Sequence, residues 1–208
     1  MRPGLILCAV VTLAVVVSGC GQKVMVPPRI DLKEHEVVGI IEFASRSEGE
    51  LEEYVTRKFT EAIRRDQGMV RIAQLGSEMV VLEGVGGDRL DPTTFKALGD
   101  KHSVSTIITG ELVVSDIRPE VTITPWFGFA SLAAEVDATL SVQMVETSSG
   151  ASVWSSSASA TERVGEVSIF GGEHFSFDAE DPDDAYGKLV DALVEKTTRD
   201  FRVTWKRK

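Results

Sequence analysis

The chain has 208 residues, of which 43% are hydrophobic and 26% charged, as in a single globular domain. Its formal net charge of −10 argues against a nucleic-acid partner, because phosphate binding needs a concentrated basic patch. The only basic run, Lys206 to Lys208, is expected to be a solvated end. The two cysteines, Cys8 and Cys20, leave the rest of the chain without an internal disulfide or a thiol nucleophile.

The first residues indicate an export signal. Arg2 precedes an uncharged apolar stretch that is shorter than the roughly 20 residues of a bilayer-spanning helix. The stretch ends in "VSGC", which resembles the lipobox of bacterial lipoproteins. That resemblance implies that Cys20 is lipidated and becomes the mature N-terminus, with residues 1–19 as the signal peptide. The alternatives are an ordinary secretory signal or an N-terminal anchor helix.

The residue after Cys20 is Gly21 rather than Asp. In Gram-negative lipoproteins an Asp at this position commonly retains the protein at the inner membrane. The resemblance therefore implies an outer-membrane lipoprotein on the periplasmic face, held to the membrane through Cys20. Pro27-Pro28 favours an extended backbone, so residues 20–36 are predicted to be a lipidated tether.

The remaining residues, 37–208, predict one α/β (α+β) domain, with a single mixed β-sheet and packed helices in the order β-α-β-α-β-β-β-α. Asp91 and Pro92 form a helix start, as N-cap and first helical residue. Residues 77–87 are ambiguous between a short helix and an irregular crossover. The predicted strands are residues 37–43, 69–75, 104–117, 135–146 and 151–164, and the predicted helices are residues 49–68, 90–103 and 181–205.

Three stretches resemble one family group: "VVGIIEF" (37–43), "LDPTTFKALGDKHSVSTIITGEL" (90–112) and "LSVQMVETSSGASVWSSSAS" (140–159). This group is the curli-secretion-channel (CsgG-like) lipoproteins, with the TolB amino-terminal domain and the LpoB-type activators of peptidoglycan synthases as relatives in fold. The resemblance covers roughly residues 37–204. In the channel family, two hairpins leave the domain and join a ring-shaped transmembrane pore.

This chain has insertions at both hairpin positions, at about 115–137 and 161–181. In the first, apolar and polar residues alternate with the period of two that is typical of a strand. Its tip carries Trp126, Phe127 and Phe129, and aromatic residues are typical of a membrane interface. One apolar face is formed by Ile117, Pro119, Val121 and Ile123 on the way up and by Ala130, Leu132, Ala134 and Val136 on the way down.

The second insertion predicts a weaker hairpin. Val167 and Ile169 alternate before the turn pair Gly171-Gly172, and Phe175 and Phe177 alternate after it. The aromatic and aliphatic residues of both hairpins are the predicted membrane or partner contacts. Insertion into the membrane and packing against a partner or the parent domain both remain open, because soluble antiparallel strands alternate in the same way.

No catalytic constellation is evident, and no cofactor or metal is expected. His35, His102 and His174 lack metal-ligand spacing. The acidic residues Asp178 to Asp184 either hold calcium or, more simply, lie at the positive N-terminus of the last helix. The expected function is non-enzymatic: oligomerisation in secretion or envelope assembly, with a LpoB-like module that regulates an envelope enzyme as the alternative.

Overall fold

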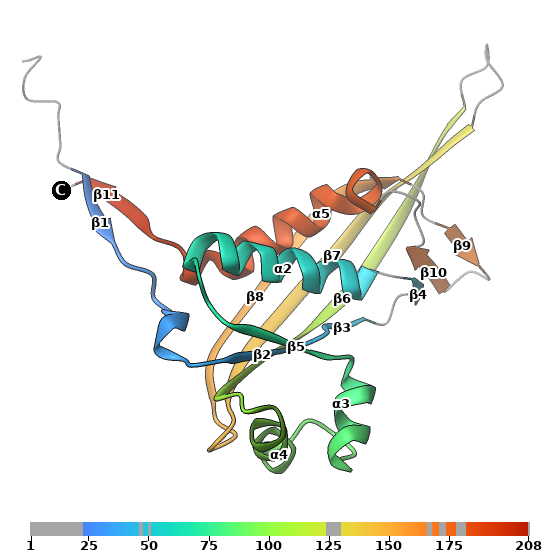
Figure 1. Ribbon diagram of the computed structural model, residues 1–208. Helices are drawn as coiled ribbons and strands as arrows, with labels where there is room; N and C mark the ends of the chain where they lie inside the picture. The colour runs from blue at the N-terminus through green and yellow to red at the C-terminus, as the bar shows by residue number, and fades with distance from the viewer. Residues whose placement is uncertain are drawn as a thin grey trace, which may run out of the picture.

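The computed structural model describes residues 23–45, 48–49, 51–123, 130–165, 168–170, 174–177 and 182–207. Its centre is a mixed sheet in the order β5-β2-β6-β7-β8, with the short β3 also paired to β6 (Figure 1). β5, β2 and β6 run parallel, while β6, β7 and β8 are antiparallel neighbours. The predicted α+β class is therefore confirmed. The strands are β2 (Val38–Ile41), β3 (Ala44–Ser45), β5 (Ile72–Gly76), β6 (Thr106–Ile123), β7 (Ala130–Glu146) and β8 (Ser152–Gly165).

Helices cover the sheet on both faces. α2 (Leu51–Gln67) and α5 (Pro182–Thr197) pack on one face and form the larger core with β2, β6, β7 and β8. α3 (Glu78–Val85) and α4 (Pro92–His102) cover the other face at one end, over a smaller core. The short 3-10 helix η2 (Thr198–Phe201) follows α5, and its Phe201 ring meets Trp154 of β8 edge-on at 4.7 Å.

The last predicted helix, residues 181–205, is wrong at its C-terminal end: α5 ends at Thr197, η2 follows, and β11 (Thr204–Arg207) is a strand. Local apolar spacing could not show this, because the strand that pairs with β11 lies at the other end of the chain. The predicted start of α4 agrees with the structure. The Asp91 side chain accepts a hydrogen bond from the Thr94 backbone N–H at 2.9 Å, as an N-cap does. Gly68, directly after α2, has a φ of 73°, which a glycine adopts without strain. The ambiguous stretch after β5 is helical, since α3 occupies most of it.

The segment predicted to be a tether is partly folded onto the domain. β1 (Lys23–Val26) pairs antiparallel with β11 (Thr204–Arg207). The 3-10 helix η1 (Leu32–Glu34) follows, and its Leu32 is fully buried. Residues 23–35 therefore do not serve as a free spacer. The prediction was wrong there because it used local composition, whereas the partners of β1 and Leu32 lie far away in the sequence.

A small second sheet stands beside the main one, in the order β4-β10-β9. It contains β4 (Glu48–Gly49), β9 (Ser168–Phe170) and β10 (His174–Phe177). β9 and β10 are antiparallel, which confirms a hairpin at the second insertion, and β10 also pairs parallel with β4. The pairing with β4 was not predicted from the sequence, because β4 and β10 are distant in the chain.

Candidate functional site

The first predicted hairpin is formed by β6 and β7, which leave the main sheet without interruption. Their pairing runs from Thr106↔Glu146 to Ile123↔Ala130, and Figure 1 shows both strands extending beyond the helices. The register sets Ile117 opposite Val136 and Val121 opposite Leu132. The apolar positions of the two arms are thus cross-strand partners, as the alternation predicted.

A β-bulge at Ser115 shifts the register of the outer part of β6 by one residue. Val114 pairs with Ala138, but the next pair is Asp116↔Asp137, so Ser115 has no partner position. A bulge shifts the side-chain alternation by one residue. As a result, even-numbered residues of β6 such as Leu112 pair with even-numbered residues of β7 before the bulge, and odd-numbered residues such as Ile117 do so after it.

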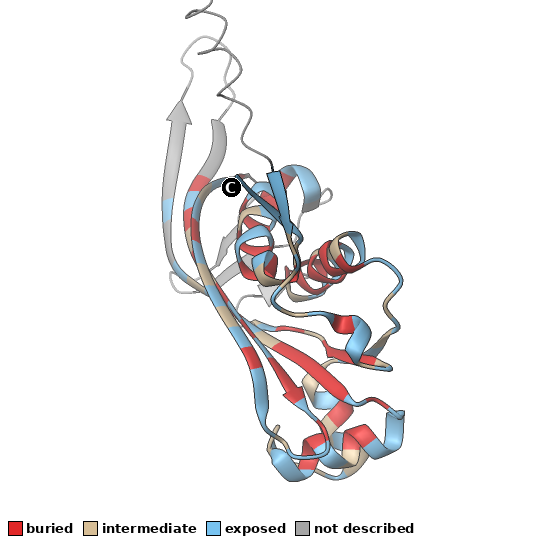
Figure 2. Cartoon of the chain, turned by 90° about the vertical axis from the view of Figure 1, so that its left-hand side faces the viewer, coloured by how far each residue is buried: buried red, intermediate tan, exposed pale blue. Residues whose placement is uncertain are grey.

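The base of this apolar face is covered by the protein's own helix. Ala134 and Val136 of β7 are 2% and 0% exposed, and Val164 of β8 is fully buried (Figure 2). They belong to one core cluster with Tyr186 and Val190 of α5. Near the domain, the hairpin therefore packs against its parent domain, which was one of the two open alternatives.

Ion pairs between the strands stabilise the opposite face of the hairpin base. Arg118 contacts Glu135 at 2.6 Å and Asp137 at 3.0 Å across the strands. A hydrogen bond from Thr161 of β8, and then the Arg118 guanidinium, lower the pKa of Asp137 below its usual 3.8. These ion pairs were not predicted from the sequence. A signal for them was present, because Arg118 and Glu135 lie the same number of residues from the hairpin tip and therefore become cross-strand partners.

The residues predicted to make the contact are only partly described. Trp126, Phe127, Phe129 and Val167 lie outside the described residues. Ile169 lies opposite Phe175 in the β9–β10 pair, and Phe177 pairs with Gly49 of β4. Their role as contact residues stays a prediction.

Cys20 also lies outside the described residues, and its lipidation stays a prediction. Within the described part of the chain, no helix is both long enough and apolar enough to span a membrane.

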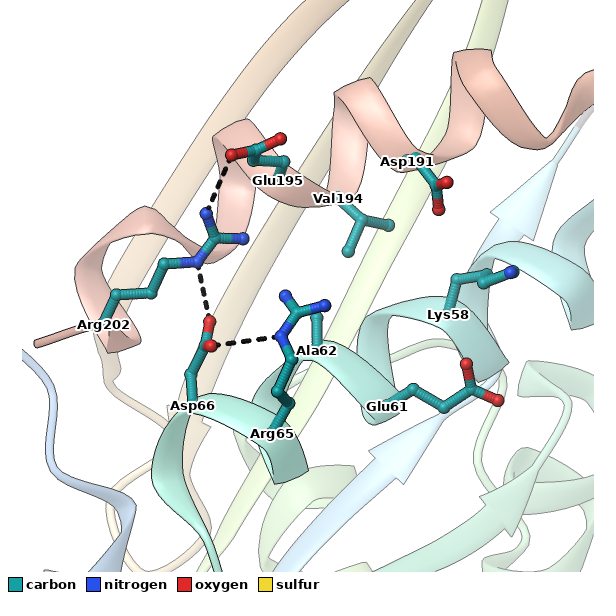
Figure 3. A pocket seen from close by; sticks show the side chains of 9 residues that line it. All are labelled: Lys58, Glu61, Ala62, Arg65, Asp66, Asp191, Val194, Glu195 and Arg202. Carbon is teal, nitrogen blue, oxygen red and sulfur yellow. Dashed lines mark hydrogen bonds and ion pairs between the residues drawn. The ribbon is translucent and has the colours of Figure 1, made fainter.

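A charged groove of about 620 Å³ lies between α2 and α5 (Figure 3). Arg202 donates from Nε to Asp66 at 2.7 Å and from Nη1 to Glu195 at 3.2 Å. Arg65 contacts the other oxygen of Asp66 at 3.3 Å. The groove's charges thus pair largely with one another across the two helices, which indicates an ionic link between helices rather than a ligand site.

The acidic stretch before α5 has a structural role where it is described. Asp183, in the first turn of α5, accepts a hydrogen bond from the Tyr54 hydroxyl at 2.6 Å and forms an ion pair with Lys58. Lys58 and then Tyr54 lower the pKa of the Asp183 carboxyl below its usual value of 3.8. Burial, followed by the hydrogen bond to Asp183, raises the pKa of Tyr54. Asp178 to Asp181 lie outside the described residues.

The structure describes one side-chain contact of a histidine. His35 shares a hydrogen bond of 2.7 Å between its Nδ1 and the Thr106 hydroxyl. Among the residues that the structure describes, no group of three or more His, Cys, Asp or Glu side chains is arranged to hold a metal ion.

Comparison with known proteins gives only distant structural likenesses. No family model matches the chain, and no curated protein matches it. A PelC dodecamer from Paraburkholderia phytofirmans is 13% identical with a TM-score of 0.45, covering 88% of this chain and 98% of that one. The LpoB C-terminal domain from Salmonella enterica is 10% identical with a TM-score of 0.39, covering 66% and 86% respectively. Lipoprotein GNA1162 from Neisseria meningitidis is 13% identical with a TM-score of 0.35, covering 61% and 83%.

LpoB belongs to the relatives in fold named in the sequence resemblance, whereas none of these three structures is a curli-secretion channel. All three TM-scores are below 0.5, so these likenesses carry no inference about the function of this chain.

Proposed function

We propose that the chain is a lipid-anchored protein of the bacterial cell envelope, that it acts by binding and without catalysis, and that the β6–β7 hairpin is its binding element. The observation that carries the proposal is the combination of "VSGC" at the end of the apolar leader with a long hairpin built as a continuation of the core sheet. The partner class is another envelope protein, as in the LpoB-type alternative. Placement in the outer membrane rests on Gly21.

The construction of the hairpin supports a binding arm. One face of its base packs against α5, and on the other face Arg118 forms ion pairs across the two strands. These contacts fix the direction in which the arm leaves the domain. Because Ala134 and Val136 of β7 are buried in the core of the parent domain, this part of the arm does not face lipid.

A second candidate function is self-assembly, in secretion or envelope assembly. β8 is the edge strand of the main sheet, and its residues from Ser152 to Thr161 carry no charge. Proteins usually protect long edge strands with charges or proline, because an open edge pairs with another strand. An edge strand with no charged residue of its own over this length suits pairing between subunits, on either side of the Ser159 carbonyl that Lys196 binds.

The proposal is tested by site-specific photo-crosslinking in living cells. A photoreactive residue replaces Gly128, between Phe127 and Phe129, and the control carries it at the exposed Lys96 of α4. An adduct with an envelope protein is expected only from position 128, and Trp126→Ser with Phe127→Ser is expected to abolish it. Adducts at multiples of the mature chain's own mass identify self-assembly instead. Absence of any protein adduct contradicts both candidates.

Lipidation is tested separately. Mass spectrometry of the membrane fraction is expected to find the peptide that begins at Cys20 with acyl chains attached. An unmodified N-terminus at any other residue would show that the leader is an ordinary signal or an anchor helix.

A further inference from the structure

The two-stranded β1–β11 ribbon exposes a tryptophan close to the predicted anchor. Trp205 is 63% exposed, and its cross-strand partner Met25 is 56% exposed. The ribbon begins at Lys23, which follows Cys20 after only Gly21 and Gln22. Trp is enriched at membrane–water interfaces, where its ring is half in the apolar layer and its N–H reaches polar groups. An exposed Trp–Met pair at this position fits a bilayer surface.

Two cations share the face of the ribbon that carries Trp205 and Met25, in a chain that is acidic overall. Lys23 is the register partner of Arg207, and side chains two residues apart in a strand lie on the same face, so Lys23, Met25, Trp205 and Arg207 lie together. Lys206 lies on the opposite face of the ribbon, where it lines a cavity of about 410 Å³ with Arg29, Lys196 and Arg199.

The cations of the cavity face are partly engaged within the domain, since Arg29 pairs with Asp200 at 3.3 Å and Lys196 donates to the Ser159 carbonyl at 2.7 Å. On the Trp205 face, Lys23 and Arg207 have no ion-pair partner in the part of the chain that the structure describes. Their charges remain available to an external anion.

We infer that the ribbon surface, defined as Lys23, Met25, Trp205 and Arg207, docks on an anionic phospholipid bilayer. The inference rests on the proposed lipidation of Cys20, which brings this surface to a membrane. Acyl chains alone attach the domain without orienting it. The ribbon surface adds an orientation, because an interfacial Trp and two cations contact headgroups on one side only.

Vesicle binding by the unlipidated mature chain tests this inference. The protein lacks residues 1–19 and carries Cys20→Ser, so no acyl chain contributes. Binding is expected to vesicles with anionic lipid and not to neutral vesicles, and to weaken as salt rises. Since each cation near an anionic surface strengthens binding about fivefold, Lys23→Gln with Arg207→Gln should weaken it about 25-fold. The matched control is Arg89→Gln with Lys96→Gln, two exposed cations at the α4 end, and it should bind normally.

Fluorescence quenching by brominated lipids places the contact. In a Trp126→Phe background, quenching is expected to disappear on Trp205→Phe. Three outcomes overturn the inference: equal binding to neutral vesicles, loss of binding with Trp126→Ser and Phe127→Ser but not with the ribbon variants, or a dimer in light scattering that the ribbon variants abolish. Because the protein is unlipidated, failure of Cys20 modification in cells is detected independently by mass spectrometry.

Discussion

At the scale of single residues, the contacts that decide the architecture lie between helices. Asp183 joins the start of α5 to Tyr54 and Lys58 of α2, and the Tyr54 and Tyr186 rings meet edge-on at 5.2 Å beside it. The acidic stretch was predicted to lie at the helix N-terminus, and the structure adds a specific set of donors on α2.

Asp183→Asn is predicted to lower stability at neutral pH. The pKa of Asp183 is lowered in the folded state, so its carboxylate stabilises the fold above the unfolded value near 3.8 and this contribution is lost as pH falls through the folded pKa. Urea unfolding should therefore show a deficit for the variant at pH 7 that shrinks as the pH falls below 3.8. Asp88→Asn, at an exposed position, should change stability little at any pH, and an equal deficit at low pH would refute the assignment.

At the scale of elements, the bulge at Ser115 determines which residues of outer β6 lie on each face of the hairpin. Without it, the odd-numbered residues of outer β6 would lie on the outer face, and Arg118 would lie on the face covered by α5. The Ser115 hydroxyl contributes only an exposed hydrogen bond of 3.2 Å to the Asp137 carbonyl. The extra backbone residue is therefore the important feature, and the side chain is not.

Deletion of Ser115 is predicted to destabilise the protein by about 3 kcal/mol or more, because it forces either Arg118 toward the core or a slip of the whole arm. Ser115→Ala is the matched control and should cost about 1 kcal/mol or less. Chemical denaturation of both variants measures the difference. Similar values for the two would show that the bulge has no structural role.

At the scale of the whole molecule, Gln67 connects three distant parts of the chain. It is 5% exposed at the end of α2, accepts a hydrogen bond from the Leu32 N–H at 3.0 Å and donates to the carbonyls of Ile30 and Phe201. These bonds attach two segments to α2: the one that follows β1 and the one that precedes β11. Gln67 thereby positions both strands of the ribbon.

Gln67→Ala is predicted to lower the free energy of unfolding by about 2–4 kcal/mol, since it leaves a buried N–H and two carbonyls without their partner. It should also expose Lys23 and Arg29 to trypsin under native conditions. Gln143→Ala, at an exposed position on β7, is the control and should cost about 0.5 kcal/mol. Unchanged proteolysis of Gln67→Ala would mean that the ribbon is positioned by other contacts.

Several elements could be predicted from local signals in the sequence. α2 and α4 follow from apolar periodicity and the Asp91 cap, and the pairing of β6 with β7 follows from alternation on both sides of a tip. These signals arise from neighbours along the chain, so they can be recognised without knowledge of the fold.

The remaining features depend on contacts between distant segments, which are visible only in the folded chain. Lys23 and Arg207 are register partners in one sheet, Glu48 and Ser176 are register partners in another, and Asp66 forms an ion pair with Arg202. Each contact joins segments that no local pattern relates. The bulge at Ser115 could not be predicted either. The apolar residues of β6 alternate regularly on each side of it, and only the register with β7 reveals the shift of one residue between the two stretches. Long-range pairing thus turned a predicted tether into a ribbon and a predicted hairpin into an arm supported by α5.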